Sequence, residues 1–418
     1  MDAISPRTGR ASRTKRRILA ALLAGGAGAA AGFLWTGDLS SLGIVALVPP
    51  IGLFLSKGSS AIFFLSYFLS AIRSVPAFYP IFYSGATALS GVPVWLAWGA
   101  CLVLPWILAR HLTVVRPSVS VPGRLLIGYL PAFFPPLWFV GAASPLFSAG
   151  ILFPGLGLPG LVLLVVFQSV LSALLNSRWE RRSMRLVFVG LTVVSLIANA
   201  LERPPTSPSG WVALGTADEP RPLLQRPPWE FAVAKRVLSA LDSGARVVLL
   251  PEGIATFWTK DPAGQISLPY PWSGIDREAR ARHATVLIGS EVPENSRMRV
   301  WDDALVALGE GGIRAFPARQ PIPVAGWNPF SKTHHEPSHW RKTGVATIAG
   351  SRALVSLCFE DLLIGSQVEA DLLGHPRVVL SADNLWFSKG TSDRGFQSVS
   401  IRSIGRLFGI PVLRAVNQ

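Results

Sequence analysis

The chain contains little cysteine, with two residues among 418. Cys101 lies in the apolar run WLAWGACLVLPWILA, and Cys358 lies in the second half of the chain. Two such distant cysteines give no disulfide framework, so Cys358 is predicted to be a free thiol. The sequence also lacks a Walker phosphate loop, a dinucleotide-binding fingerprint and an internal repeat. We therefore expect no cofactor.

Acidic residues are scarce as well: 24 Asp and Glu stand against 39 Lys and Arg, which gives a formal net charge of +15. Such a charge could serve nucleic-acid binding. However, many of the basic residues lie in short segments between apolar runs, where they set the topology of a membrane protein. Direct binding of nucleic acid is therefore not expected.

Long apolar runs, by contrast, are abundant. Half of the residues are hydrophobic, and the excess lies in the first half of the chain. A helix needs about 20 apolar residues to cross a bilayer. After a basic tail at 1–17, the region 18–201 is therefore predicted to be a transmembrane helical domain of about seven spans. The spans are expected at 18–36, 42–56, 60–78, 89–109, 125–141, 157–175 and 185–201.

In this count, the basic residues lie in the links on one side of the membrane. They precede the first span and recur after the second, fourth and sixth spans, whereas the opposite links carry none. Cytoplasmic links carry the excess of Lys and Arg. The region after Leu201 is therefore predicted to lie on the periplasmic face of a bacterial inner membrane. The first span could instead be a signal peptide, because KRRILAALLAGGAGAAAG has the basic and apolar regions of one.

The composition changes at 202–210, ERPPTSPSG, which is predicted to be a linker. The segments over 211–418 then alternate between strand and helix types, which indicates an α/β sheet domain. Strands are expected in RVVLLPEG, ATVLIGSEV, RALVSLCFED, RVVLSADNLWF and PVLRAVNQ, and helices in WEFAVAKRVLSALDSGA and RGFQSVSIRSIGRLFGI. In such sheets, chemistry gathers where polar residues follow the strand ends.

Glu252 and Cys358 each follow the end of a predicted buried strand. A thiol attacks a carbonyl carbon only as the thiolate, so a base must take its proton. A carboxylate at a neighbouring strand end could be that base. The alternative is a core cysteine and an unrelated loop acid, since free cysteine is often simply buried.

Four segments, LLPEG, SLCFED, SADNLWF and GIPVLRAVNQ, occur in this order. They resemble the nitrilase (carbon–nitrogen hydrolase) superfamily, and this resemblance implies an αββα sandwich. Together with the apolar first half, they are similar to the bacterial apolipoprotein N-acyltransferases. The whole arrangement, which includes ARQPIPVAGWNPF, most resembles a family of conjugal transfer proteins of conjugative plasmids. That resemblance implies partners in the conjugation machinery.

The resemblance also implies roles for individual residues. Nitrilase-type enzymes use a Glu–Lys–Cys triad, in which Glu252 matches the general base and Cys358 the nucleophile. Glu360 matches an acid that follows the cysteine in the acyltransferases, and Phe359 stands where they usually have tyrosine. The implied intermediate is a thioester, which an amine or water releases. In the acyltransferases the acyl donor is a phospholipid and the acceptor a lipoprotein, which implies contact with membrane lipids.

Trp327 and Trp386 lie in segments that join the predicted strands. With Phe359, they are candidates for an apolar, substrate-binding mouth at the membrane surface, because Trp favours that interface. The alternative is ordinary packing in the core or in loops.

The chain departs from the family pattern at the lysine. The segment RAFPARQPIPVAGW contains none, so Arg319 is the nearest candidate for the group that stabilises an oxyanion. A guanidinium stays protonated and cannot shuttle a proton. Gly326 and Trp327 stand in place of an expected loop glutamate. Three interpretations remain open: an amidase or acyltransferase with another substrate, a true apolipoprotein N-acyltransferase, and a catalytically inactive component of the conjugation apparatus.

The segment HEPSH at 335–339 fits the zinc pattern H-E-x-x-H. That site requires a helix, which Pro337 would interrupt, so no metal site is expected. Lys332 and Lys342 flank the segment and rank below Arg319 as sources of a positive charge.

Overall fold

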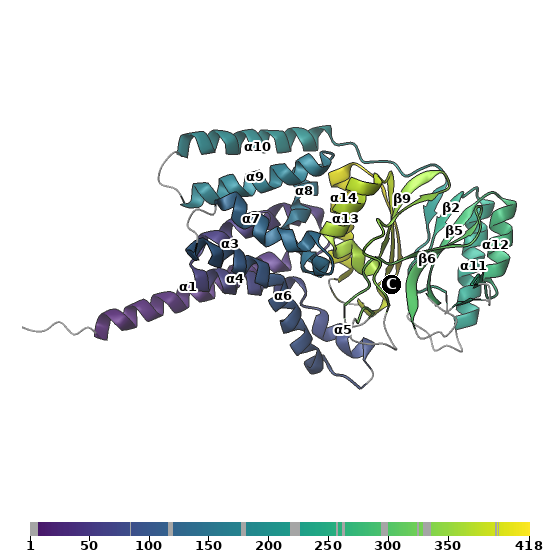
Figure 1. The fold of residues 1–418 in the computed structure, drawn as a ribbon, viewed down its shortest axis with the longest axis horizontal. Helices are drawn as coiled ribbons and strands as arrows, with labels where there is room; N and C mark the ends of the chain where they lie inside the picture. The colour runs from purple at the N-terminus through teal and green to yellow at the C-terminus, as the bar shows by residue number, and fades with distance from the viewer. Residues whose placement is uncertain are drawn as a thin grey trace, which may run out of the picture.

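The computed structural model consists of a helical half and an α/β half that pack against each other (Figure 1). It describes residues 7–83, 85–115, 120–176, 181–217, 226–255, 258–260, 264–293, 300–323, 326–328, 336–388, 391 and 393–418. The helical half contains α1 (Arg7–Phe33), α2 (Leu39–Val45), α3 (Val48–Phe54), α4 (Lys57–Ala71), α5 (Val75–Phe82), α6 (Ala88–Val115), α7 (Val121–Tyr129), η1 (Leu130–Phe133), η2 (Leu137–Gly141), η3 (Pro145–Ser148), α8 (Ala149–Leu152), α9 (Gly157–Asn176) and α10 (Arg181–Leu201).

Three helical segments in the described part of the chain are long and apolar enough to cross a membrane, namely Ala88–Leu112, Gly157–Leu175 and Arg182–Leu201. They belong to α6, α9 and α10. Helices α4 and α5 form a fourth candidate if they count as one span, which is bent by 49° at the break between them. Most of the α10 surface is exposed although it is apolar. Such a surface is compatible with a lipid environment.

Two of the predicted spans are not single helices. The segment 42–56 forms the two short helices α2 and α3, and the segment 125–141 forms α7 followed by the 3-10 turns η1 and η2. Proline stands in the first turn of α3 and of η1, and it lacks the backbone N–H that would continue the preceding helix. The number of seven spans stays a prediction.

Small residues allow α1 and α4 to pack closely. A side chain at Gly28 would overlap the backbone of Phe63, and one at Gly32 would overlap the carbonyl oxygen of Tyr67. Their spacing of four places both glycines on one face of α1. The glycine-rich segment that also fits a signal peptide therefore has a packed position in the helical half.

The α/β half contains two sheets, in the strand orders β1–β2–β5–β6–β7 and β11–β10–β9–β8. Three strands of each sheet are parallel (β1, β2 and β5; β9, β10 and β11), and the others pair antiparallel. The strands are β1 (Trp211–Ala213), β2 (Val247–Leu249), β5 (Thr285–Pro293), β6 (Trp301–Gly309), β7 (Arg314–Pro317), β8 (Val345–Ile348), β9 (Ser351–Leu357), β10 (Val378–Asn384) and β11 (Val412–Asn417), with a small hairpin of β3 (Thr259–Lys260) and β4 (Ile266–Ser267).

Each sheet has helices on one face and the other sheet on the opposite face. In β2, Val247 and Leu249 point into the core between the sheets, whereas Val248 packs with residues of α11 (Arg226–Asp242) and α12 (Trp272–Ala281). Helices α13 (Ile364–Gly374) and α14 (Asp393–Phe408) cover the second sheet (Figure 1). The four layers are helix, sheet, sheet and helix, which is the predicted αββα sandwich.

One apolar core continues from the helical half into α13 and α14. Trp138 and Phe147 of the helical half belong to the same buried cluster as Ile364 of α13 and Val399 and Ile404 of α14. The predicted linker, 202–210, contains no helix or strand. The two halves are therefore joined by a shared core as well as by this linker.

Candidate functional site

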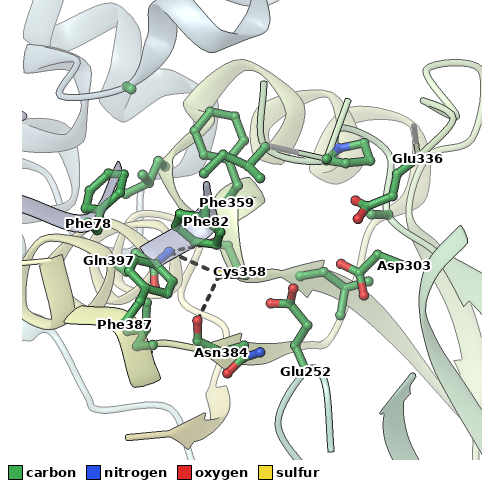
Figure 2. Close-up of a pocket in the computed structure, with 18 of the residues that line it drawn as sticks. Phe78, Phe82, Glu252, Asp303, Glu336, Cys358, Phe359, Asn384, Phe387 and Gln397 are labelled. Atoms are coloured by element: carbon green, nitrogen blue, oxygen red, sulfur yellow. Dashed lines mark hydrogen bonds between the residues drawn. The ribbon is translucent and has the colours of Figure 1, made fainter. Parts of the chain in front are cut away.

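A cavity of about 300 Å³ lies where the two halves meet. Its polar side includes Glu252, which follows β2, and Cys358, which follows β9 (Figure 2). Its apolar side includes Phe78 and Phe82 of α5 and Trp98 of α6. The two groups that the sequence selected for chemistry therefore reach one cavity, which both halves line.

Cys358 is the first residue after β9 and has a φ of 39°. This left-handed conformation is uncommon for a residue with a side chain and costs of order 1–3 kcal/mol. Gln397 of α14 supports the turn, because its Nε2 donates to the Cys358 carbonyl oxygen at 3.1 Å and lies 3.6 Å from the sulfur. The sulfur lies 3.9 Å from the carbonyl oxygen of Asn384. The strained turn places the thiol at the cavity wall.

Glu252 lies in a turn that packs tightly on β5. A side chain at Gly289 would overlap the Cα of Glu252, and Gly253 has a φ of 69°, which favours glycine. The carboxyl of Glu252 is turned toward Cys358 (Figure 2). Its Oε2 is buried and has no hydrogen-bond partner among the described residues. The same carboxyl interacts with Cys358 and Asp303.

Burial raises the pKa of both groups well above their ordinary values. For Glu252, the charge of Asp303 raises the pKa further, and a hydrogen bond with Cys358 opposes the rise. For Cys358, the charges of Glu252 and Asp383 add to the effect of burial. The resting site therefore favours a neutral thiol beside a neutral carboxyl. A positive group near them would favour the thiolate.

Asp303 and Glu336 also line the cavity (Figure 2), and the sequence analysis did not select them. Asp303 lies in β6, where the segment WDDALVALG places two acids at the start of an apolar strand. That pattern could have identified it. Burial raises the pKa of Asp303 to about 7. Burial, and then the charge of Asp303, raise the pKa of Glu336 well above its ordinary value.

The Glu336 carboxyl lies against Gly326, since a side chain at Gly326 would overlap its Oε2 and Cδ. The resemblance implied a loop glutamate where this chain has Gly326 and Trp327. In the structure, the carboxyl of Glu336, from a later segment, lies beside Gly326. In the same segment, His339 Nε2 lies 2.7 Å from Asp302 Oδ1. His335 lies outside the described residues. The part of the chain that the structure describes contains no group of three or more His, Cys, Asp or Glu that could hold a metal.

Glu360 is buried behind the nucleophile and does not line the cavity. Its Oε1 accepts hydrogen bonds from the backbone N–H groups of Arg319 at 2.7 Å and Gln320 at 3.2 Å. Its Oε2 accepts one from Leu357 at 3.0 Å. Burial raises the pKa of Glu360, while the charge of Arg319 and these hydrogen bonds oppose the rise. Glu360 therefore links the start of the Cys358 turn to the segment of Arg319 and Gln320.

Arg319 is placed differently from what the sequence led us to expect. Its guanidinium is buried, donates to Glu369 Oε2 at 2.5 Å and to the Ser366 carbonyl oxygen at 2.8 Å, and lies 4.7 Å from the Trp138 ring centre. It does not line the cavity. The preceding residue, Ala318, lines it instead, and the Ala318 N–H donates to the Asp303 carbonyl oxygen at 2.8 Å.

The aromatic candidates lie at or beside the cavity. Phe359 and Trp386 line it, and the Phe359 ring centre lies 5.8 Å from that of Trp98. Trp327 lines a neighbouring recess of about 330 Å³, almost wholly apolar, which extends between α5, α6, Ile322 and Pro323. Phe78 lines both spaces. The apolar mouth predicted from the sequence thus has a counterpart beside Cys358.

Within the described residues, no Lys, Arg or His nitrogen forms an ion pair with Glu252, Asp303 or Glu336. Lys332 lies outside the described residues. Lys342 is exposed and does not line the cavity. Glu291 of β5 is a further acid that lines the cavity, so the described wall of the site carries acids and amides together with apolar residues.

Comparison with solved structures gives amidases as similar chains. An amidase from Nesterenkonia is 15% identical, with a TM-score of 0.36 over 50% of this chain and 75% of that chain. A cysteine-to-serine variant of this amidase, from the nitrilase superfamily, is 16% identical, with a TM-score of 0.37 over 50% of this chain and 76% of that chain. No protein-family model matches the chain.

Comparison with curated proteins gives relatives that extend through both halves. Conjugal transfer protein TraB of Agrobacterium fabrum is 27% identical over 380 residues, which are 84% of this chain and 81% of the relative. A probable conjugal transfer protein TraB of Sinorhizobium fredii is 27% identical over 360 residues, which are 84% of this chain and 86% of that one. The resemblance predicted from the sequence is thus confirmed: over most of its length, this chain is similar to proteins named conjugal transfer protein TraB.

Proposed function

We propose that this chain is a membrane protein of plasmid conjugal transfer whose α/β half forms a thioester with an acyl group at Cys358. The observation that carries the proposal is the meeting of the Glu252 carboxyl and the Cys358 thiol in one cavity with an apolar wall. A buried base beside a strained cysteine turn is the arrangement that nucleophilic catalysis requires. The similarity to proteins named for conjugal transfer supports the cellular role.

The proposed reaction has two steps. In the first, Glu252 in its ionised form takes the thiol proton, the sulfur attacks the acyl carbonyl carbon, and the bond from that carbon to the leaving group breaks as Glu252 returns the proton to the leaving group. In the second, an amine or water attacks the thioester, gives its proton to Glu252, and the C–S bond breaks. Gln397 Nε2, which lies 3.6 Å from the sulfur, is a described donor that could stabilise the developing oxyanion.

We propose a membrane lipid as the acyl donor. The apolar recess beside the cavity is lined by residues of α5 and α6, including Phe82 and Trp98, and by Trp327. An acyl chain that lies in this recess would present its carbonyl group to Cys358. The apolar exposed helices support a position in the bacterial inner membrane, and the pattern of basic residues supports a periplasmic α/β half.

Replacing Cys358 by Ala and by Ser, followed by measurement of plasmid transfer, tests the requirement for catalysis. Catalysis requires that both variants lose transfer at normal expression. Mass spectrometry of the purified protein should find an acyl adduct on the wild-type Cys358 peptide, and no adduct on the same peptide of the Ala variant. Full transfer by the Ala variant would show that catalysis is not the role that transfer requires.

A second candidate function is a structural component of the mating apparatus that keeps the fold without turnover. The lack of a described cation beside the carboxyls and the raised pKa of the thiol favour it. It predicts that the Ala variant transfers plasmid normally and that no adduct forms. A true apolipoprotein N-acyltransferase, the third interpretation, would complement the loss of that enzyme in a bacterial host, whereas the other two would not.

A further inference from the structure

Two arginines face each other where α6 ends and α7 begins. Trp106 of α6 packs on Gly128 of α7, since a side chain at Gly128 would overlap the Trp106 ring. Because α7 begins soon after α6 ends, the two helices run in opposite directions at this contact. Residues four apart share one face of a helix. Arg110 of α6 and Arg124 of α7 therefore lie on the facing sides, one turn closer to the link between the helices.

The positive charges of this arginine pair lie close together and partly out of water. Both residues are half-buried, and the Arg124 Nε has no hydrogen-bond partner among the described residues. Burial lowers the pKa of Arg124, and the charge of Arg110 lowers it further. The sequence has no Asp or Glu between Asp38 and Glu180, so these helices supply no acid to balance the pair. A bound anion would relieve the repulsion.

The break between α3 and α4 adds a third positive charge beside the pair. Arg110 Nη2 donates to the carbonyl oxygen of Leu55, the last residue before the break, at 2.8 Å. This bond fixes the guanidinium at the end of α3. Lys57, which is exposed, begins α4 two residues later.

Apolar side chains surround these charges. Leu108 and Leu112 flank Arg110 and are 49% and 41% exposed, Leu126 follows Arg124 and is 54% exposed, and Phe54 of α3 is 47% exposed. A soluble anion would leave these side chains uncovered. A ligand with a negative head and apolar chains would cover them while it neutralises the arginines.

We propose that Arg110 and Arg124 bind the phosphate group of an anionic glycerophospholipid. A phosphate diester carries one negative charge, and its oxygens accept hydrogen bonds from guanidinium groups. The pattern of basic residues puts this end of the helices on the cytoplasmic side, where anionic lipids attract basic pockets between helices. A topology signal needs only positive charge near the membrane, and does not need two arginines on facing sides of packed helices. The inference rests on the membrane location in the proposed function and not on the chemistry at Cys358.

Thermal unfolding of the delipidated full chain in dodecyl maltoside, with dioleoyl phosphatidylglycerol or dioleoyl phosphatidylcholine at equal mole fraction, tests this inference. We expect phosphatidylglycerol to raise the melting temperature by about 3 °C more than phosphatidylcholine does, which corresponds to a roughly tenfold preference. The double variant Arg110→Gln, Arg124→Gln should lose this difference. The control Arg182→Gln, Arg185→Gln removes the same charge from exposed positions of α10 and should keep it.

Three results would overturn the inference. They are equal shifts with both lipids in the wild type, equal loss of the difference in both double variants, and an equal rise with sodium phosphate in place of lipid. The last result would indicate a site for a soluble anion.

Arg124→Gln alone gives a second test, which distinguishes lipid binding from a structural role. Without lipid, this variant should melt no lower than the wild type, because it removes the repulsion with Arg110. With phosphatidylglycerol, it should gain less than the wild type gains. A variant that melts lower without lipid and gains as much from phosphatidylglycerol would contradict the inference.

These outcomes separate the inference from the proposed catalysis. An acyl adduct on Cys358 without any preference for phosphatidylglycerol would refute the lipid site and keep the catalysis. A preference for phosphatidylglycerol without an adduct would do the reverse.

Discussion

Replacing Asp303 by Asn should stabilise the protein, and the gain should grow with pH. Burial raises the pKa of this carboxyl to about 7, against an ordinary value of about 4. Below pH 4 the group is protonated in both the folded and the unfolded chain, so it costs no stability. Between pH 4 and 7 the unfolded chain ionises first, and stability falls as the pH rises. Above pH 7 the full cost is present.

The size of that cost follows from the two pKa values. At 1.36 kcal/mol for each pKa unit, it is about 4 kcal/mol above pH 7. This is an upper bound, since Glu252 and Asp303 share part of the effect. The Asn side chain keeps the shape and cannot ionise, so the variant should recover most of this free energy at pH 8 and little at pH 4.5. A domain of this size gains roughly 2–4 °C in melting temperature for each kcal/mol.

The assay is thermal unfolding of the full chain in detergent, for wild type and variant, at pH 4.5, 6, 7 and 8. The difference in melting temperature, variant minus wild type, should be near zero at the lowest pH and several degrees at the highest. Glu310→Gln, at an exposed position, should show no such trend. A constant difference across the series, or a variant that is less stable at pH 8, would refute the reasoning about buried charge.

Three other predictions concern the geometry around the nucleophile. Gly289→Ala would force the Glu252 turn away from β5, so the rate of adduct formation on Cys358 should fall by on the order of a hundredfold. Gly274→Ala, at a helical glycine with open space, is the control. An unchanged rate in Gly289→Ala would contradict the assigned role of the turn. Glu360→Gln weakens hydrogen bonds from three backbone N–H groups and should destabilise the protein by about 2–3 kcal/mol in denaturant unfolding, whereas a loss near zero would mean that this carboxyl does not fix the turn. In a Cys101→Ser background, iodoacetamide should label Cys358 only slowly at pH 8 and faster above pH 9, because burial raises the thiol pKa; rapid labelling at pH 7 would show a stable thiolate instead.

Patterns within short segments predicted much of the α/β half. The segments around Glu252 and Cys358 form the predicted strands, because buried runs of β-branched residues fit both faces of a covered sheet. The amphipathic segment that became α14 was recognised in the same way. Breaks in the helical half were harder to predict, because hydropathy over 125–141 does not show where the backbone of η1 and η2 leaves the helical path.

The site was predicted in part. Glu252 and Cys358 could be paired because both follow parallel strands, whose ends meet at one edge of a sandwich. Glu336 could not, because no pattern in the sequence places its carboxyl against Gly326. Arg319 was selected from its place in a motif, although side chains next to each other in an extended segment point to opposite sides. That alternation turns Ala318 to the cavity and Arg319 to α13.

The core that α13 and α14 share with the helical half has a practical consequence. A fragment that begins after Leu201 would expose the outer faces of these two helices to water, and its cavity would lack the wall that α5 and α6 supply. Such a fragment is expected to aggregate, and a binding measurement on it would not represent the cavity of the full chain. Residues of both halves line the cavity, so both would determine which ligand fits it.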